Sequence, residues 1–197
     1  MHKIVIISSS IRFGRNSHRV AQFLYNYIVE RSLADIEILD LKECNFPIFE
    51  ERLRSLPDPS PAVLEVSGKI KKADGVIIVT PEYNGGYPAS LKNLIDLLLD
   101  EWKRKPIAVA TVSKGQFGGA HVITSLVFCL WKIGAIVVPA TFAVAKVETA
   151  YDANGSPANK EVSDSIAKSF AGELLWCIEA TSCMKISAQM QTTGTEA

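Results

Sequence analysis

The fold of this chain is predicted by one stretch, Gly75-Val76-Ile77-Ile78-Val79-Thr80-Pro81-Glu82-Tyr83-Asn84-Gly85-Gly86-Tyr87-Pro88. Its first five residues are apolar or small, which is typical of a short strand buried on both faces. Apolar residues then recur at helical spacing between residues 88 and 99. Between strand and helix, prolines restrict the backbone, glycines allow close approach and tyrosines offer aromatic faces. Such a turn suits the binding of a flat ring with polar edges.

The same alternation of strand and helix recurs along the whole chain. Apolar runs predict strands at Lys3–Ser8, Ile36–Leu41, Gly75–Thr80, Ile107–Val112 and Ala135–Ala140, the last with a continuation through residues 142–147. Helical spacing predicts helices near 20–28, 63–72, 88–99, 119–133 and 160–180. Five such units predict an α/β fold, a flavodoxin-like three-layer sandwich with a five-stranded parallel sheet and helices on both faces.

The length of 197 residues suits a single domain. We expect it to cover residues 1–188, and we expect the small, polar residues 189–197 to be a disordered tail. The connection over residues 42–61 carries four prolines and is long for a loop. It is either a functional lid or a segment that packs on the surface through its own apolar side chains.

Composition narrows the class of protein. The chain is 48% hydrophobic and its 21 basic and 21 acidic residues cancel, so no overall field attracts nucleic acid or acidic membranes. No apolar run approaches the length of a membrane span, and no cationic leader precedes the first strand. A cytoplasmic location is the expectation. The four cysteines are far apart and the three histidines lack paired spacing, so we predict no disulfide framework and no metal site.

The loop after the first strand is rich in groups that bind anions. It reads Ser8-Ser9-Ser10-Ile11-Arg12-Phe13-Gly14-Arg15-Asn16-Ser17-His18, with hydroxyl groups, two guanidinium groups and a helix start at its end. The first amides of a helix have no partner within the helix, and they bind phosphate readily. Since neither G-x-x-x-x-G-K-[ST] nor G-x-G-x-x-G is present, a monophosphate fits this loop better than a nucleoside triphosphate or a dinucleotide.

Two motifs together resemble one enzyme family. Pro81-Glu82-Tyr83-Asn84-Gly85, followed by Pro88, Leu91-Lys92-Asn93 and Asp96, resembles the signature of NAD(P)H-dependent FMN reductases. Ser10-x-Arg12-x-x-Arg15 resembles the phosphate loop of the same family. The resemblance implies a flavodoxin-like fold that binds FMN noncovalently. It also implies two-electron reduction of a flavin, quinone or azo acceptor by NADPH or NADH, with ping-pong kinetics.

The resemblance also assigns residues. Those expected to hold the FMN phosphate are Ser10, Arg12, Asn16, Ser17 and His18. Those expected around the flavin ring are Pro81, Glu82, Tyr83 and Asn84, together with Ser113 and Gly115 after the fourth strand. No side chain is expected to be catalytic, because FMN carries the chemistry. Gly86-Tyr87 departs from the family pattern, and we expect Tyr87 to narrow the ring-facing pocket. Lys92, Asn93 and Asp96 are expected to anchor helix and loop.

Two helices are more apolar than a helix on the outside of a sheet should be. They are the predicted helices at 88–99 and 119–133. A homodimer built on both helices would cover this surface, with a tetramer as a larger assembly, and burial under the 42–61 loop is the alternative. Two other functions compete with the reductase: a flavodoxin-type electron carrier and a flavin-dependent regulatory module. Electron carriers of that kind are usually strongly acidic, whereas this chain is neutral.

Overall fold

The computed structural model describes residues 1–193 and contains one parallel sheet. Its strands are β1 (Lys3–Ser8), β2 (Asp35–Asp40), β3 (Gly75–Pro81), β4 (Pro106–Val112) and β5 (Ile136–Val144). They lie side by side in the order β2-β1-β3-β4-β5. This order confirms the flavodoxin-like prediction. The fifth strand is longer than its first predicted segment, because it continues to Val144, into the first half of the proposed continuation over residues 142–147.

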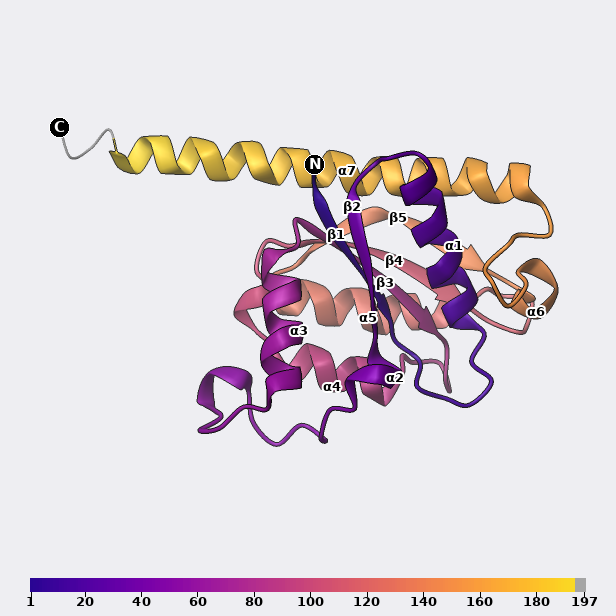
Figure 1. Ribbon diagram of the computed structural model, residues 1–197, viewed down its shortest axis with the longest axis horizontal. Coiled ribbons are helices and arrows are strands. Elements are labelled where there is room, and N and C mark those ends of the chain that lie inside the picture. Colours follow the sequence, from indigo (N-terminus) through magenta and orange to yellow (C-terminus); the bar gives the residue numbers. More distant parts are fainter. Residues whose placement is uncertain (194–197) are drawn as a thin grey trace.

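The helices form a layer on each face of the sheet (Figure 1). They are α1 (Ser17–Glu30), α2 (Leu41–Cys44), α3 (Pro61–Lys72), α4 (Ala89–Leu97), α5 (Ala120–Lys132), α6 (Val147–Ala150) and α7 (Lys160–Thr193), with 3₁₀ turns η1 (Leu53–Ser55) and η2 (Asp100–Trp102). Helices α1 and α7 pack on one face of the sheet, whereas α3, α4 and α5 pack on the other. Because both faces are covered, strands β1, β3 and β4 are almost wholly buried.

Helix α4 differs from the expectation for its apolar surface. Leu97 on α4 and Trp102 in the following turn η2 are buried inside the protein and offer no surface to a partner. The 42–61 connection covers this side, and Asn93 on α4 fastens it. The Asn93 Oδ1 accepts the Phe49 backbone N–H at 2.6 Å, and its Nδ2 donates to the Pro47 carbonyl at 2.8 Å. Phe46 and Phe49 of the connection also pack against the core on this side, which confirms the alternative of a packed surface segment. The apolar residues of α4 are thus covered within the chain, and a homodimer stays a prediction.

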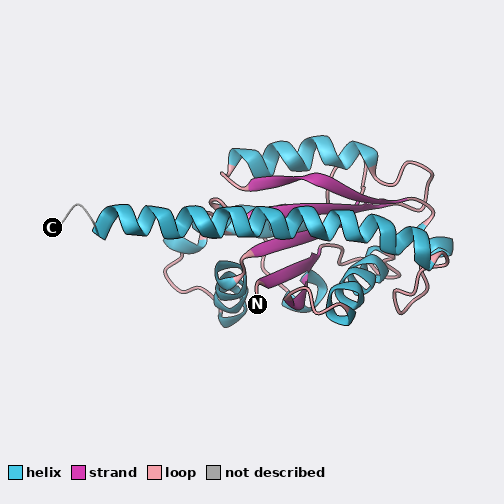
Figure 2. Cartoon of the chain, turned by 90° about the horizontal axis from the view of Figure 1, so that it is seen from above, coloured by secondary structure: helices cyan, strands magenta, loops and turns pink. Residues whose placement is uncertain are grey.

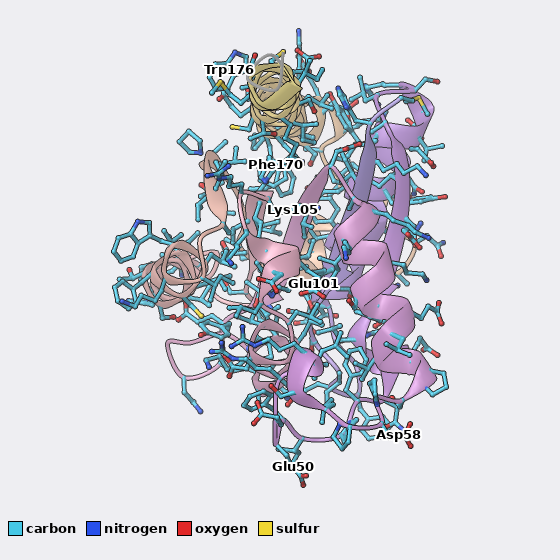
Figure 3. All side chains as sticks on the ribbon, turned by 90° about the vertical axis from the view of Figure 1, so that its left-hand side faces the viewer. Glu50, Asp58, Glu101, Lys105, Phe170 and Trp176 are labelled. Carbon is cyan, nitrogen blue, oxygen red and sulfur yellow. The ribbon has the colours of Figure 1, made fainter. Side chains whose placement is uncertain are left out.

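Helix α7 is longer than predicted. It has 34 residues and ends at Thr193, so it includes residues 189–193 of the segment for which we expected disorder. Residues 194–197 lie outside the described part of the chain. The helix lies along the sheet and its far end extends past the other elements (Figure 2). Phe170 points from α7 toward the sheet and Trp176 points away from it (Figure 3).

The topology brings three loops to one end of the sheet. In a doubly wound sheet, ligands bind beyond the carboxyl ends of the strands, where neighbouring connections run in opposite directions. Here the chain leaves β1 toward β2 at one side, and later returns to place β3 on the other side of β1. The loops after β1, β3 and β4 therefore meet. Within residues 1–193, no helix combines the length and the apolarity that crossing a membrane requires.

Candidate functional site

The three loops enclose a cavity of about 490 Å³. Its lining comes from all three: Ser10, Arg12, Phe13, Gly14, Arg15, Asn16 and Ser17 after β1, Pro81, Glu82 and Tyr83 after β3, and Val112, Ser113, Lys114 and Gly115 at β4, with Val147 beside them. Nine of the eleven predicted site residues line it. The other two, His18 and Asn84, do not.

The loop after β1 is held against the sheet at its start. The backbone N–H of Ser9 donates to the Val79 carbonyl at 3.1 Å, and the Ser90 hydroxyl donates to the Ser9 carbonyl at 2.6 Å. Arg15 donates from Nη1 to the Ser10 carbonyl at 2.7 Å. These contacts fix the backbone of the loop, and they leave the side chain of Arg12 at the cavity.

The start of α1 offers unused hydrogen-bonding groups. Asn16, the N-cap residue, makes no side-chain bond to the helix, because its Nδ2 donates instead to Glu148 Oε1 at 3.2 Å. The Ser17 hydroxyl is buried at the cavity and has no protein partner. Buried polar groups are normally paired, so an orphan hydroxyl beside free helix amides indicates a ligand with acceptor oxygens. A phosphate group fits this description.

An ion pair holds the loop after β1 to the end of β2. Both terminal nitrogens of the Arg15 guanidinium group bind the Asp40 carboxylate at the end of β2. Burial raises the pKa of Asp40, but hydrogen bonds from Arg15 and from the Lys42 amide outweigh burial and hold it below its usual value. Asp40 therefore stays ionised near neutral pH, and Arg15 is partly neutralised. Of the two arginines at the loop, Arg12 is the one free to meet an anion.

His18 takes a different place from the one predicted. Its Nδ1 lies 3.0 Å from the Ser8 hydroxyl and 3.6 Å from Asp40 Oδ2. The ring therefore faces the Arg15–Asp40 ion pair and not the cavity. Burial, with the nearby charge of Arg15, lowers the pKa of His18. His18 thus lies outside the cavity lining, with its ring directed to Ser8 and Asp40, and its predicted contact with a phosphate stays a prediction.

The loop after β3 begins with a tight hairpin turn. Tyr83 and Gly86 exchange two backbone hydrogen bonds, of 2.8 and 3.0 Å. Between them, Asn84 and Gly85 have φ values of 52° and 77°. Positive φ at both central residues defines a type I′ turn, for which Asn-Gly is the preferred pair. Asn84 is therefore well suited to the turn. Its exposed side chain does not line the cavity, and its contact with a ring stays a prediction.

The two tyrosines of this loop point to different places. The Tyr83 hydroxyl is 2.7 Å from the Ser10 hydroxyl, and the Arg12 guanidinium group lies 5.2 Å from the centre of the Tyr83 ring. Tyr87 instead packs against the apolar core under α4 and α5. Burial and a hydrogen bond with Cys129 raise the pKa of Tyr87. Tyr87 is therefore not part of the cavity lining, which gives no support to the expectation that it narrows the pocket.

The loop after β4 closes the cavity, and a residue that sequence reasoning missed ties it down. Glu148 on α6 accepts from Lys114 Nζ at 2.7 Å and from Asn16 Nδ2 at 3.2 Å. Hydrogen bonds from Lys114 and then Asn16 lower the pKa of Glu148. The Gly115 carbonyl accepts from the Ser113 hydroxyl at 3.0 Å. No local pattern marks Glu148, because its partners are distant in sequence.

The cavity contains no group of side chains suited to a metal. Throughout the described residues, no cluster of histidine, cysteine, aspartate and glutamate side chains could hold a metal ion. Instead, the cavity has an anion-binding end at α1 and Arg12, and a flatter end lined by Pro81, Tyr83 and the turn at Ser113. That division suits a molecule with a phosphate at one end and a ring at the other.

Comparison with known proteins agrees with this description. An NAD(P)H-dependent FMN reductase from a Nectria species is 33% identical over 129 residues, which cover 60% of this chain but only 62% of that protein. An NADPH azoreductase from a Bacillus species is 31% identical over 139 residues, 70% of this chain and 73% of that protein. The flavoenzyme NAD(P)H:(acceptor) oxidoreductase of Paracoccus denitrificans superposes with a TM-score of 0.74 at 25% identity, covering 91% of this chain and 98% of its own. The sequence profile described as NADPH-dependent FMN reductase matches residues 2–149. The chain therefore belongs to the NADPH-dependent FMN reductase family.

Proposed function

We propose that this chain binds FMN and transfers two electrons from NADPH or NADH to a flavin, a quinone or an azo compound. The observation that carries the proposal is the single cavity that joins the free helix start of α1 to the turn after β3. The first suits a phosphate and the second suits a ring. When bound, FMN would supply the redox chemistry, and the protein would position it and exclude water from one side.

The phosphate end of the proposed site uses four residues. Ser10 and Ser17 would offer hydroxyl groups, Asn16 would offer its place at the start of α1, and Arg12 would offer a positive charge. Hydrogen bonds to charged groups contribute roughly 1.5–3 kcal/mol each, so a few of them would retain a phosphate firmly. The buried, unpartnered Ser17 hydroxyl is the structural feature that supports this assignment most directly.

The ring end uses backbone and aromatic surface. Pro81 and Tyr83 would line one side of the ring, and the turn at Ser113 and Gly115 would line the other. Backbone N–H groups of the loop after β3 would stabilise negative charge on the ring, as an oxyanion hole stabilises developing charge. No side chain is required to transfer a proton or to form a covalent bond, which agrees with the absence of a predicted catalytic residue.

A ping-pong mechanism is part of the proposal. One open cavity serves the site, so the nicotinamide and the acceptor would occupy the same space in turn. Each product would leave before the next substrate enters. Lys114 lines the cavity and would attract the phosphates of a pyridine nucleotide. Its ion pair with Glu148 partly neutralises this charge. The choice among acceptors and between NADPH and NADH stays open, as does the expected cytoplasmic location.

We also propose a homodimer, now built on α5 alone. Phe128 and Trp131 on its outer face are 61% and 64% exposed, and their ring centres lie 5.8 Å apart. An exposed aromatic pair on a helix that begins at the cavity suits contact with a second copy. A tetramer would need a further surface, and the exposed Trp176 on α7 is one large apolar side chain that could form it.

Anaerobic spectroscopy tests the central proposal. The purified protein should take up one FMN and show a flavin spectrum that bleaches with NADPH and returns when a quinone is added. Repeated cycles with excess NADPH identify an enzyme. A flavodoxin-type carrier would bind FMN but would show no steady oxidation of NADPH, and a protein that binds no FMN would contradict the proposal entirely.

A further inference from the structure

The carboxylate of Glu82 lies at the start of α5. Its Oε2 accepts the backbone N–H groups of His121 at 2.9 Å and Val122 at 3.2 Å, and its Oε1 lies 3.1 Å from His121 Nδ1. These backbone groups belong to the second and third residues of the helix. They are the same two amides that an N-cap side chain normally binds.

Helix α5 has no cap of its own. Its N-cap residue is Gly119, which carries no side chain and has a φ of 79°. A Cβ at this position would lie 3.0 Å from the side chain of Thr111, so the close packing of the chain on β4 requires glycine. The sequence therefore cannot cap α5 locally, and the loop after β3 supplies the missing acceptor.

Glu82 sits between two residues that line the cavity. Pro81 precedes it and Tyr83, the first residue of the type I′ turn, follows it. The side chain of Glu82 is 19% exposed, and its hydrogen bond to the Val122 amide is partly buried, whereas the contacts with His121 are open to solvent. The helix start also carries a partial positive charge that favours a carboxylate. The anchored carboxylate thus fixes the position of its own backbone and of the neighbouring ring-facing residues.

We propose that the Glu82 carboxylate is a positioning residue that latches the ring-facing loop to α5. The inference rests on the proposed function, because it gives this latch the task of holding the loop amides in register with the flavin ring. It assigns Glu82 no contact with the phosphate and no part in the chemistry. A loop released from α5 would bind the ring less well while the phosphate site stayed intact.

Paired flavins separate the two ends of the site. FMN carries ring and phosphate, whereas riboflavin carries the ring without the phosphate. Glu82→Ala should weaken the binding of both flavins by a similar factor, on the order of tenfold, as expected when a charge-assisted cap is lost. Glu82→Gln keeps an acceptor oxygen for the helix amides and should recover most of that loss. Fluorescence titration measures the dissociation constant of each flavin. The visible circular dichroism of bound FMN reports whether the surroundings of its ring have changed.

A matched control distinguishes the latch from general destabilisation. Glu101 also accepts a backbone N–H, from Leu99 at 3.1 Å, and a hydroxyl, from Ser67 at 2.6 Å, but it lies away from the cavity. Glu101→Ala should lower the stability and leave both flavin constants unchanged. Unchanged riboflavin binding by folded Glu82→Ala, or a loss confined to FMN, would overturn the inference.

Hydrogen exchange tests the latch without any flavin. In the ligand-free protein, Glu82→Ala should speed exchange of the amides at residues 82–86 and at His121 and Val122, and Glu101→Ala should not. Equal exchange in wild type and Glu82→Ala would refute the latch even if flavin binds. Failure of the wild type to bind FMN would refute the proposed function, and faster exchange would still support the latch.

Discussion

The hydroxyl groups of Ser10 and Tyr83 lie 2.7 Å apart and join the loop after β1 to the loop after β3. One residue belongs to the proposed phosphate end and the other to the ring end. Tyr83→Phe removes this bond and keeps the aromatic surface, so FMN affinity should fall by roughly fivefold, the equivalent of about one hydrogen bond. Tyr83→Ala also removes the surface and should cost more. Equal affinities for the two variants, measured by fluorescence titration, would contradict a role for the ring.

Arg12 is expected to distinguish FMN from riboflavin. Its guanidinium group is the one at the cavity that is not paired with Asp40. Arg12→Ala should weaken FMN binding roughly 10- to 100-fold and leave riboflavin binding nearly unchanged. The variant should also lose much of the salt dependence of FMN binding. Arg52→Ala, in the 42–61 connection, is the control, and an equal loss for both flavins would remove Arg12 from the phosphate end.

His18 should make the stability of the protein depend on pH. Its pKa is lowered in the folded state, by burial and then by Arg15, so the unfolded chain binds the proton more readily. The contribution of neutral His18 is then complete above about pH 6.5 and is lost as the pH falls toward the folded pKa. His18→Gln should flatten this part of the curve of unfolding free energy against pH. Identical curves for His18→Gln and wild type would contradict the partly buried, neutral ring.

Gly85 should resist substitution because of its backbone conformation alone. Its φ is 77°, and an added Cβ would meet nothing within 4 Å. Gly85→Ala should therefore cost about 1–2 kcal/mol of unfolding free energy, the penalty for a left-handed residue. Gly68 in α3 has the same open surroundings, but without a positive φ. Gly68→Ala should stabilise the helix by about 0.5–1 kcal/mol. In chemical denaturation, the unfolding free energy should therefore fall for Gly85→Ala and rise for Gly68→Ala.

Trp131 should control the assembly of the protein. If α5 forms the dimer, Trp131→Glu places a charge in the interface and should give monomers in sedimentation velocity at micromolar concentration. Trp176→Glu is the matched control, since it alters an equally exposed tryptophan on α7. It should leave the dimer intact and would break only a larger assembly. A monomeric wild type, or a Trp131→Glu dimer, would refute the α5 interface.

The sequence predicted the sheet because its central strands β1, β3 and β4 are nearly continuous apolar runs, which parallel strands buried on both faces require. It predicted most of the cavity because the residues lie in the loops that follow the strands. Asn93 shows where a local pattern succeeded, since it was expected to anchor a loop and does so at the Phe49 amide.

Other features depend on contacts that no local pattern reveals. His18 turns toward Asp40, which arrives from the end of another strand. Glu148 reaches Asn16 across 132 positions of sequence. Tyr87 lies in the same motif as Tyr83, yet Tyr83 lines the cavity whereas Tyr87 packs against the core. The apolar residues of α4 resembled a partner surface because the sequence did not show that the 42–61 connection covers them.

The packing of α7 makes the folding unit longer than the segment by which the family is recognised. The family profile ends at residue 149, but the inner side of α7 completes the core beside α1 and the sheet. Phe170, Leu174 and Ile178 are almost wholly buried there. A truncated protein ending at residue 150 would keep every cavity residue. It would nevertheless expose to solvent the apolar face of the sheet that α7 covers. Such a fragment should aggregate on expression, so recombinant versions of this chain need to extend beyond Ile178 in its last helix.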